Sequence, residues 1–186
     1  MTYALTDCHE EQDYRYSLLA TTGAAGSASL VVVQCNPSRA SGKRSDPTVG
    51  KVATWAEENG FRSVTFLNLF ARRSPTVHEI SHLSYAELVG PRNNEVLAHH
   101  ATGSSTLVLA WGGSLPVPEE LYRQRLVEVW QLLGERAAHR VGSLAHGRYP
   151  RHGRMWNADN RTLELLEWNE LLPNNSFKPR PLRGSA

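Results

Sequence analysis

Cysteine, net charge and long apolar runs are all scarce in this sequence, and each scarcity excludes a class of protein. Only two cysteines occur, Cys8 and Cys35, and they lie far apart, which excludes a disulfide framework and a cysteine-based metal site. The formal charge of +2 is too small for binding to nucleic acid through overall charge alone. No apolar segment approaches the roughly 18 residues that span a bilayer, and the chain does not begin with a signal-peptide pattern. We therefore expect a cytoplasmic protein with no membrane partner.

The length and composition indicate a single folded unit. The chain has 186 residues, 40% of them apolar, which is enough for one sizeable core and too short for two comfortable domains. No internal repeat is present. Residues 1–172 are expected to form one α/β domain, and residues 173–186 form a polar tail with three prolines, a composition typical of disorder or of an extended strap.

Short apolar segments rich in β-branched residues predict the strands of a central sheet. Their apolar residues run continuously, which suggests burial on both faces. Four segments have this pattern, the last of them more weakly: Ser29 to Cys35, Ser63 to Phe70, Ser105 to Trp111 and His139 to Ala145. Tyr14 to Ala20 is a candidate edge strand, so that the sheet would have four or five strands.

Helix signals alternate with these strands. Asp46 and Pro47 are typical of a helix start, and Gly60 stands where that helix should stop. Short helices are predicted around Ser84 to Val89 and Pro91 to His100, and a longer one over Val117 to Gly134 with acidic residues in its first turn. The alternation predicts a three-layer α/β sandwich, with a mainly parallel sheet and helices on both faces.

Basic residues gather in the loops that follow the predicted strands, where ligands bind in parallel α/β sheets. Eight of the 20 Lys and Arg residues lie in three such loops: Arg39, Lys43, Arg44, Arg72, Arg73, Arg148, Arg151 and Arg154. The glutamates concentrate in the helices instead. This partition predicts a positive mouth suited to phosphate or to a nucleic-acid backbone, although exposed loops also collect arginine without any ligand.

Each of three polar residues in or beside these loops has two possible roles. Asn36, with Ser38 in the same loop, could hold a water or a base edge, or it could only bond its own backbone in a turn. Asn68 lies inside an apolar run, so its amide needs hydrogen-bond partners there. It could find them in the first loop, which it would then brace, or in the ligand. Asp46 is foremost a helix cap that could also serve a nearby pocket.

Aromatic, glycine and histidine residues complete the candidate site. Trp111 could stack on a base or belong to the core, and Gly112 would let the backbone approach a ligand or simply make a turn. His146 and His152 are the histidines in the basic loops, so either could act as a general acid or stabilise charge near neutral pH. No histidine has partners at metal-ligand spacing, and we expect neither a metal nor another cofactor.

Several motifs occur together in an order that resembles a bacterial family. They are "NPSRASGKRSDPT", "NLFARRSP", "VGPRNNEVL", "LVLAWGG" and "GRYPRH", and they resemble the pattern of the family DUF1643 over about Tyr14 to Arg154. The sequence departs from that pattern at Arg39, where threonine is usual, and at Ser41 or Gly42, where the family has aspartate. It departs again at Ser45, where a second acid is common before Asp46, and at Gly153, where proline is usual.

Two of these motifs are also similar to the active-site loops of the uracil-DNA glycosylase superfamily. There, an N-P-S-like loop positions a hydrolytic water and a histidine loop stabilises charge on the departing base. The resemblance implies that Asn36 positions water and that His152 supports the leaving group. The tail "NNSFKPRPLRGSA" resembles the read-through of a recombination site at the ends of integron gene cassettes. This resemblance implies where the gene lies and says nothing about what the protein does.

The residues leave three functions open. The chain could hydrolyse an N-glycosidic bond of a nucleic acid or nucleotide, it could bind nucleic acid without catalysis, or it could act on a small phosphorylated metabolite. An aromatic-lined pocket that reaches Asn36 would favour the first, a shallow basic groove the second, and a closed phosphate-sized pocket the third.

The segment Ala158 to Leu172, with Leu163, Leu166 and Leu171, is expected to form an amphipathic helix that caps the fold or joins a homodimer.

Overall fold

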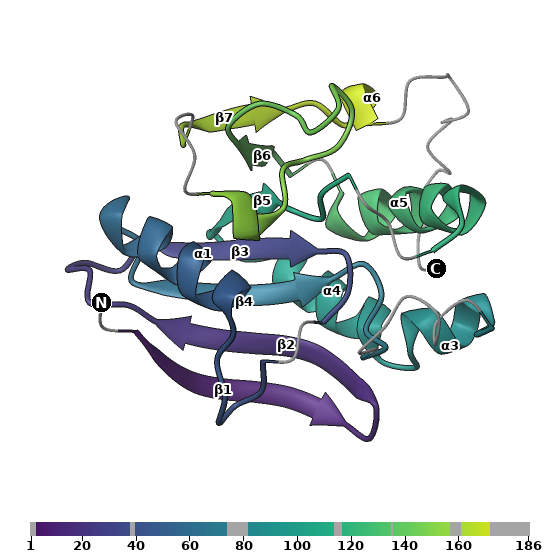
Figure 1. Cartoon of the computed structure of the whole chain (residues 1–186), viewed down its shortest axis with the longest axis horizontal. Coiled ribbons are helices and arrows are strands. Elements are labelled where there is room, and N and C mark those ends of the chain that lie inside the picture. The colour runs from purple at the N-terminus through teal and green to yellow at the C-terminus, as the bar shows by residue number, and fades with distance from the viewer. Residues whose placement is uncertain are drawn as a thin grey trace, which may run out of the picture.

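The protein folds around one mixed β-sheet of seven strands. The computed structural model describes residues 3–37, 40–73, 82–113, 117–134, 136–156 and 161–171. Within these ranges the strand order is β1-β2-β4-β3-β5-β6-β7 (Figure 1). The strands are β1 (Ala4–Glu11), β2 (Tyr14–Thr21), β3 (Ser29–Gln34), β4 (Ser63–Asn68), β5 (Thr106–Leu109), β6 (Ala138–Val141) and β7 (Leu163–Leu166).

The four buried strands predicted from apolar runs form the centre of this sheet. β4, β3, β5 and β6 pair parallel to one another, and all but the first residue of β3 are buried. β6 ends at Val141, earlier than the sequence suggested, because Gly142 takes a φ of 69° and turns the chain.

Helices cover both faces of the sheet, as the sequence analysis expected. They are α1 (Pro47–Glu58), α3 (Tyr85–Val89), α4 (Asn93–Ala101), α5 (Glu119–Leu133) and α6 (Trp168–Leu171), with a 3-10 turn η1 (Gly153–Met155). α1 packs on one face in a core that contains Val32, Trp55 and Trp156. α3, α4 and α5 pack on the other face in a core that contains Val33 and Leu126. Figure 1 shows α1 in front of the sheet and α4 behind it.

The prediction of a mainly parallel sheet with four or five strands is wrong. Three of the six strand pairings are antiparallel: β1 with β2, β2 with β4, and β6 with β7. β2 is an inner strand, since β1 covers its outer edge. The sequence did not reveal β1 because most of its side chains are polar and none is fully buried, so it lacks the apolar pattern of a strand.

The last strand corrects a second expectation. Leu163 and Leu166 were expected on an amphipathic helix, but both belong to β7, and of the described residues 161–171 only Trp168–Leu171 are helical. Spacing by three residues fits one face of a helix, yet a short run of leucines also fits an edge strand. The tail at 173–186 lies outside the described residues. Among the residues that are described, no helix has both the length and the apolar character needed to cross a membrane.

The connections around β3 and β5 create a topological switch point at the carboxyl ends of these strands. The chain leaves β3 through α1 on one face and leaves β5 through α5 on the other face. Because β3 and β5 are neighbours, the loops that follow them diverge at this point. Such a switch point is where open α/β sheets bind ligands.

Candidate functional site

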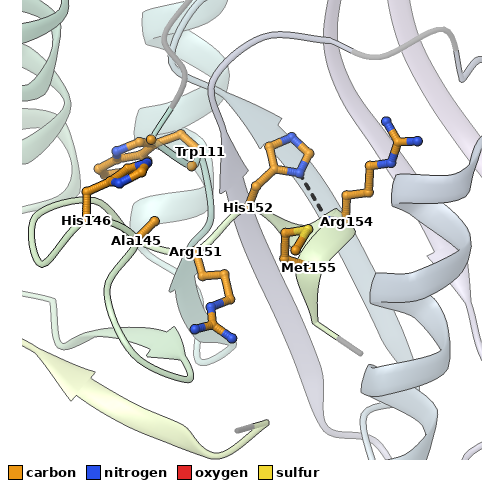
Figure 2. A pocket seen from close by; sticks show the side chains of 9 residues that line it. Trp111, Ala145, His146, Arg151, His152, Arg154 and Met155 are labelled. Atoms are coloured by element: carbon orange, nitrogen blue, oxygen red, sulfur yellow. Dashed lines mark hydrogen bonds between the residues drawn. The ribbon is translucent and has the colours of Figure 1, made fainter. Parts of the chain in front are cut away.

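A pocket of about 690 Å³ lies at the carboxyl ends of β5 and β6, beside the switch point. Its walls come from the loop after β5 and from the long loop that joins β6 to η1 (Figure 2). The lining residues are Trp111, Gly112, Gly113, Ala145, His146, Arg151, His152, Arg154 and Met155. None of them is acidic, and the volume lies in the usual range for a small-molecule site.

His152 is held in one orientation by the 3-10 turn that follows it. Its Nδ1 accepts a hydrogen bond of 3.0 Å from the backbone N–H of Arg154, which makes His152 the N-cap of η1. An accepting Nδ1 carries no proton, so the neutral ring is protonated on Nε2. Figure 2 shows Nδ1 turned toward the Arg154 backbone, with the other ring nitrogen on the far side of the imidazole.

The surroundings of His152 favour its neutral form. Burial lowers the pKa of His152, the positive charge of Arg154 lowers it further, and the negative charge of Asp46 opposes both effects. The ring is therefore an uncharged donor through Nε2–H at neutral pH, because the usual histidine pKa of about 6.5 already lies below it.

This lowered pKa predicts a loss of stability in mild acid. The unfolded chain binds a proton at His152 more readily than the folded chain, so the free energy of unfolding should fall as the pH drops below about 6.5. We expect the urea midpoint to fall less between about pH 7.5 and about pH 5.5 in His152→Asn than in the wild type. Burial also lowers the pKa of His100, so part of the fall should remain. Equal falls in both proteins would contradict the assignment.

Gly112 allows the loop after β5 to lie directly against His152. Its φ is +82°, and its N–H donates a hydrogen bond of 2.8 Å to the carbonyl of Pro150. A Cβ on Gly112 would lie 2.8 Å from the Cβ of His152, closer than such atoms approach. Glycine is thus required both for the backbone conformation and for the close contact.

Asp46 caps α1 and also fastens the preceding loop. Oδ1 accepts hydrogen bonds from the backbone N–H groups of Thr48 at 2.8 Å and Val49 at 3.0 Å, while Oδ2 accepts one from Ala40 at 3.2 Å. The capping interpretation is confirmed. The negative charge of Asp46 also raises the pKa of His152 and so opposes the effect of burial. A catalytic role for this carboxylate stays a prediction.

The rest of the loop after β3 is only partly described. Ser38 and Arg39 lie outside the described residues. Asn36 is half-buried just beyond the end of β3, and its role as a water-positioning residue stays a prediction. Lys43 and Arg44 are exposed in a tight turn that packs on β1, where a Cβ on Gly42 would lie 3.1 Å from the Cβ of Cys8.

Three of the other predicted ligand-binding arginines form ion pairs with acids that the sequence analysis did not connect to them. Arg72 pairs with Asp13 at 3.0 Å, and its guanidinium lies over the ring of Tyr14. Arg73 pairs with Glu10 of β1. Arg148 pairs with Glu119 at the start of α5. Of the basic loop residues with described positions, only Arg151 and Arg154 line the pocket. Arg151 donates to Ser143 at 2.7 Å, and Arg154 is exposed.

Asn68 braces the structure beneath the site. Its side chain is fully buried and donates to the Arg15 carbonyl at 3.3 Å, while its own carbonyl accepts from the Asn93 side chain at 3.1 Å. Trp111 is also buried, and it packs in the core with its ring centroid 6.3 Å from that of Tyr122. The contacts of Trp111 favour its interpretation as a core residue. The side chain of Asn68 bonds β2 rather than the loop after β3, so its bracing of that loop stays a prediction.

Two further lining residues are His146, one of the two candidate histidines in the basic loops, and Met155, which the sequence did not single out. His146 has a φ of +52°, which no local pattern signalled. Met155 is 55% exposed at the pocket. Among the residues with described positions, no group of three or more histidine, cysteine or acidic side chains could hold a metal ion.

Comparison with known proteins gives a family and nothing further. The family DUF1643, described as a protein of unknown function, matches residues 15–153. No curated protein and no solved structure matches the chain. The matched segment runs from β2 through His152 and so contains the central strands and most of the pocket. The chain belongs to the DUF1643 family.

Proposed function

We propose that the chain hydrolyses the N-glycosidic bond of a nucleotide, either free or within a nucleic acid, with the base bound in the pocket beside His152. The observation that carries this proposal is the fixed, neutral state of His152. Its Nδ1 is occupied by the Arg154 backbone, so the group available for a ligand is Nε2–H.

A neutral Nε2–H donor suits a reaction in which negative charge develops on a leaving base. When the glycosidic bond breaks, its electrons move onto the base, and a donor already in position stabilises that charge without reorganisation. A cationic imidazole would be more acidic and would bind anions of any kind. A neutral imidazole with a lowered pKa instead selects ligands that accept its N–H hydrogen bond. Other enzymes polarise a carbonyl group with a neutral imidazole of this kind.

The charge and size of the pocket fit a nucleotide. Arg151 and Arg154 provide positive charge, and the described lining has no acid that would repel a phosphate. The volume of about 690 Å³ accommodates a ring and an attached sugar phosphate.

The water-positioning role comes from the resemblance to uracil-DNA glycosylases and rests on Asn36. In β3, Val33 belongs to the core on the α5 face, whereas Val32 belongs to the core on the α1 face. If this alternation continued past the strand, Asn36 would turn toward the α1 face, where η1 follows His152. An amide on that face would hold a water between Asn36 and the bound ligand.

The test is release of free base from nucleoside monophosphates and from single- and double-stranded oligonucleotides with modified bases. We expect His152→Asn to slow release by roughly 100-fold or more, because one donor to the developing anion is lost. Asparagine is a good N-cap, so η1 should keep its cap. His82→Gln, at an exposed histidine, is the matched control. If the wild type binds these ligands and releases no base from any of them, the hydrolase proposal fails.

A second candidate, a non-catalytic binder of a phosphorylated ligand, is favoured by one observation. Both oxygens of the Asp46 carboxylate accept backbone hydrogen bonds, which leaves this expected catalytic residue occupied. Salt dependence separates a polymer from a small ligand, since each phosphate contact steepens the slope. With Arg72, Arg73 and Arg148 in ion pairs, we expect a shallow slope and little effect of a double Arg72→Ala, Arg73→Ala variant.

A further inference from the structure

The turn that carries His146 has an unusual backbone for its sequence. His146 and Gly147 have φ angles of +52° and +65°, and the N–H of Arg148 donates to the carbonyl of Ala145 at 3.1 Å. Positive φ at both central residues is the pattern of a type I′ turn, which favours asparagine, aspartate or glycine at its first central position. Histidine is among the non-glycine residues enriched in the left-handed region, but it carries more strain there than glycine does.

Strain of this kind is commonly found at functional sites, where the surrounding structure enforces it. Here the turn is closed by two hydrogen bonds between Ala145 and Tyr149, of 2.7 and 3.0 Å. It is also tied to the start of α5, because Arg148 pairs with Glu119 and the Tyr149 hydroxyl donates to the same carboxylate at 3.4 Å. Asparagine or glycine would form this turn at lower cost, so the turn by itself does not explain the imidazole.

The imidazole lies where a ligand in the pocket would meet it. His146 lines the pocket, and a Cβ on Gly113 would lie 2.5 Å from its Cδ2. Glycine at 113 therefore leaves the space that the ring occupies. Figure 2 shows His146 near Trp111 on one side of the pocket and His152 with Arg154 on the other side.

We infer that His146 is a specificity-determining residue of the pocket, which contacts the nucleobase from the side opposite His152. This inference rests on the proposed function. The imidazole offers a flat face for a planar ring and two ring nitrogens for polar atoms at its edge. It thus distinguishes bases by their edge groups, whereas His152 supports charge on any departing base.

The test compares variants that keep the turn and remove the imidazole. His146→Asn and His146→Gly both suit positive φ, so neither should lower the melting temperature. We expect each to weaken binding of the preferred nucleoside 5′-monophosphate by about tenfold and to change the ranking among adenine, guanine, cytosine and uracil monophosphates. Gln12, in the β1–β2 turn, is the other described non-glycine residue with positive φ. Gln12→Gly is the matched control and should leave binding unchanged.

The outcomes separate this inference from the proposal on which it rests. If His146→Asn binds with wild-type affinity and ranking while His152→Asn slows base release, His146 only forms the turn and the inference is overturned alone. Loss of binding that follows a lowered melting temperature in both His146 variants also overturns it, because the role is then structural. If the wild type binds none of the monophosphates and none of the oligonucleotides, the proposed function fails and this inference with it.

Discussion

Replacement of Arg125 by methionine is expected to destabilise the protein by about 2–4 kcal/mol, because the buried Leu69 carbonyl is left without its charged donor and two more exposed contacts are lost as well. Arg125 of α5 is fully buried. Its guanidinium donates to the Leu69 carbonyl at 2.5 Å and to Asn94 at 2.6 Å, and it pairs with Glu128 at 2.9 Å. One side chain thus joins α5, α4 and the segment after β4, and methionine leaves all three acceptors without this donor.

The comparison variant is Arg123→Met on the same helix. Arg123 pairs with Glu119 one turn away, and its side chain is 55% exposed, so its loss should cost less than about 1 kcal/mol. Urea unfolding of the two variants measures the difference, and melting temperatures should differ by roughly 10 °C. Equal stabilities would mean that the Arg125 contacts contribute no more than a surface pair.

The parts of the fold that the sequence predicted well are those with strong local signals. β3 and β4 have buried apolar runs, and α1 has a capping aspartate followed by proline. Ser84 and Glu87 likewise form a capping box at α3. These signals act over a few residues, so they can be read without knowledge of the tertiary structure.

The parts that it missed depend on contacts between distant segments. Whether Arg73 faces a ligand or a carboxylate depends on Glu10, 63 positions away in the chain. That carboxylate lies on β1, an edge strand whose polar sequence gave no sign of its structure. The positive mouth was inferred from clustering in the sequence, but ion pairing neutralises part of it.

The location of the pocket was easier to predict than the residues that line it. The rule that ligands bind at the carboxyl ends of parallel strands led to the loops that contain Trp111, Gly112, Arg151 and His152, and all four line the pocket. The rule does not say which side chains converge. Convergence depends on the turn at His146 and on the close contact at Gly112, and both require backbone conformations with positive φ.

Gly112→Ala is the substitution expected to damage the candidate site most. Alanine at a φ of +82° is strained by about 1–2 kcal/mol, and its Cβ would lie 2.8 Å from the Cβ of His152, which adds an overpacking cost of about 1–3 kcal/mol. Relief of the clash requires His152 to move, so that Nε2–H no longer points where it did. We expect base release, or ligand binding if no release occurs, to fall at least as much as in His152→Asn.

Gly60→Ala separates backbone strain from the contact with His152. Gly60 follows α1 with a φ of +78°, and a Cβ there would meet nothing within 4 Å, so the variant should show the strain cost with normal ligand binding. Urea unfolding and the base-release assay, performed on both variants, give the two readouts. If Gly112→Ala is no less stable than Gly60→Ala and retains wild-type activity, then the contact between Gly112 and His152 does not position the imidazole. In that case the orientation of His152 must come from the Arg154 hydrogen bond alone.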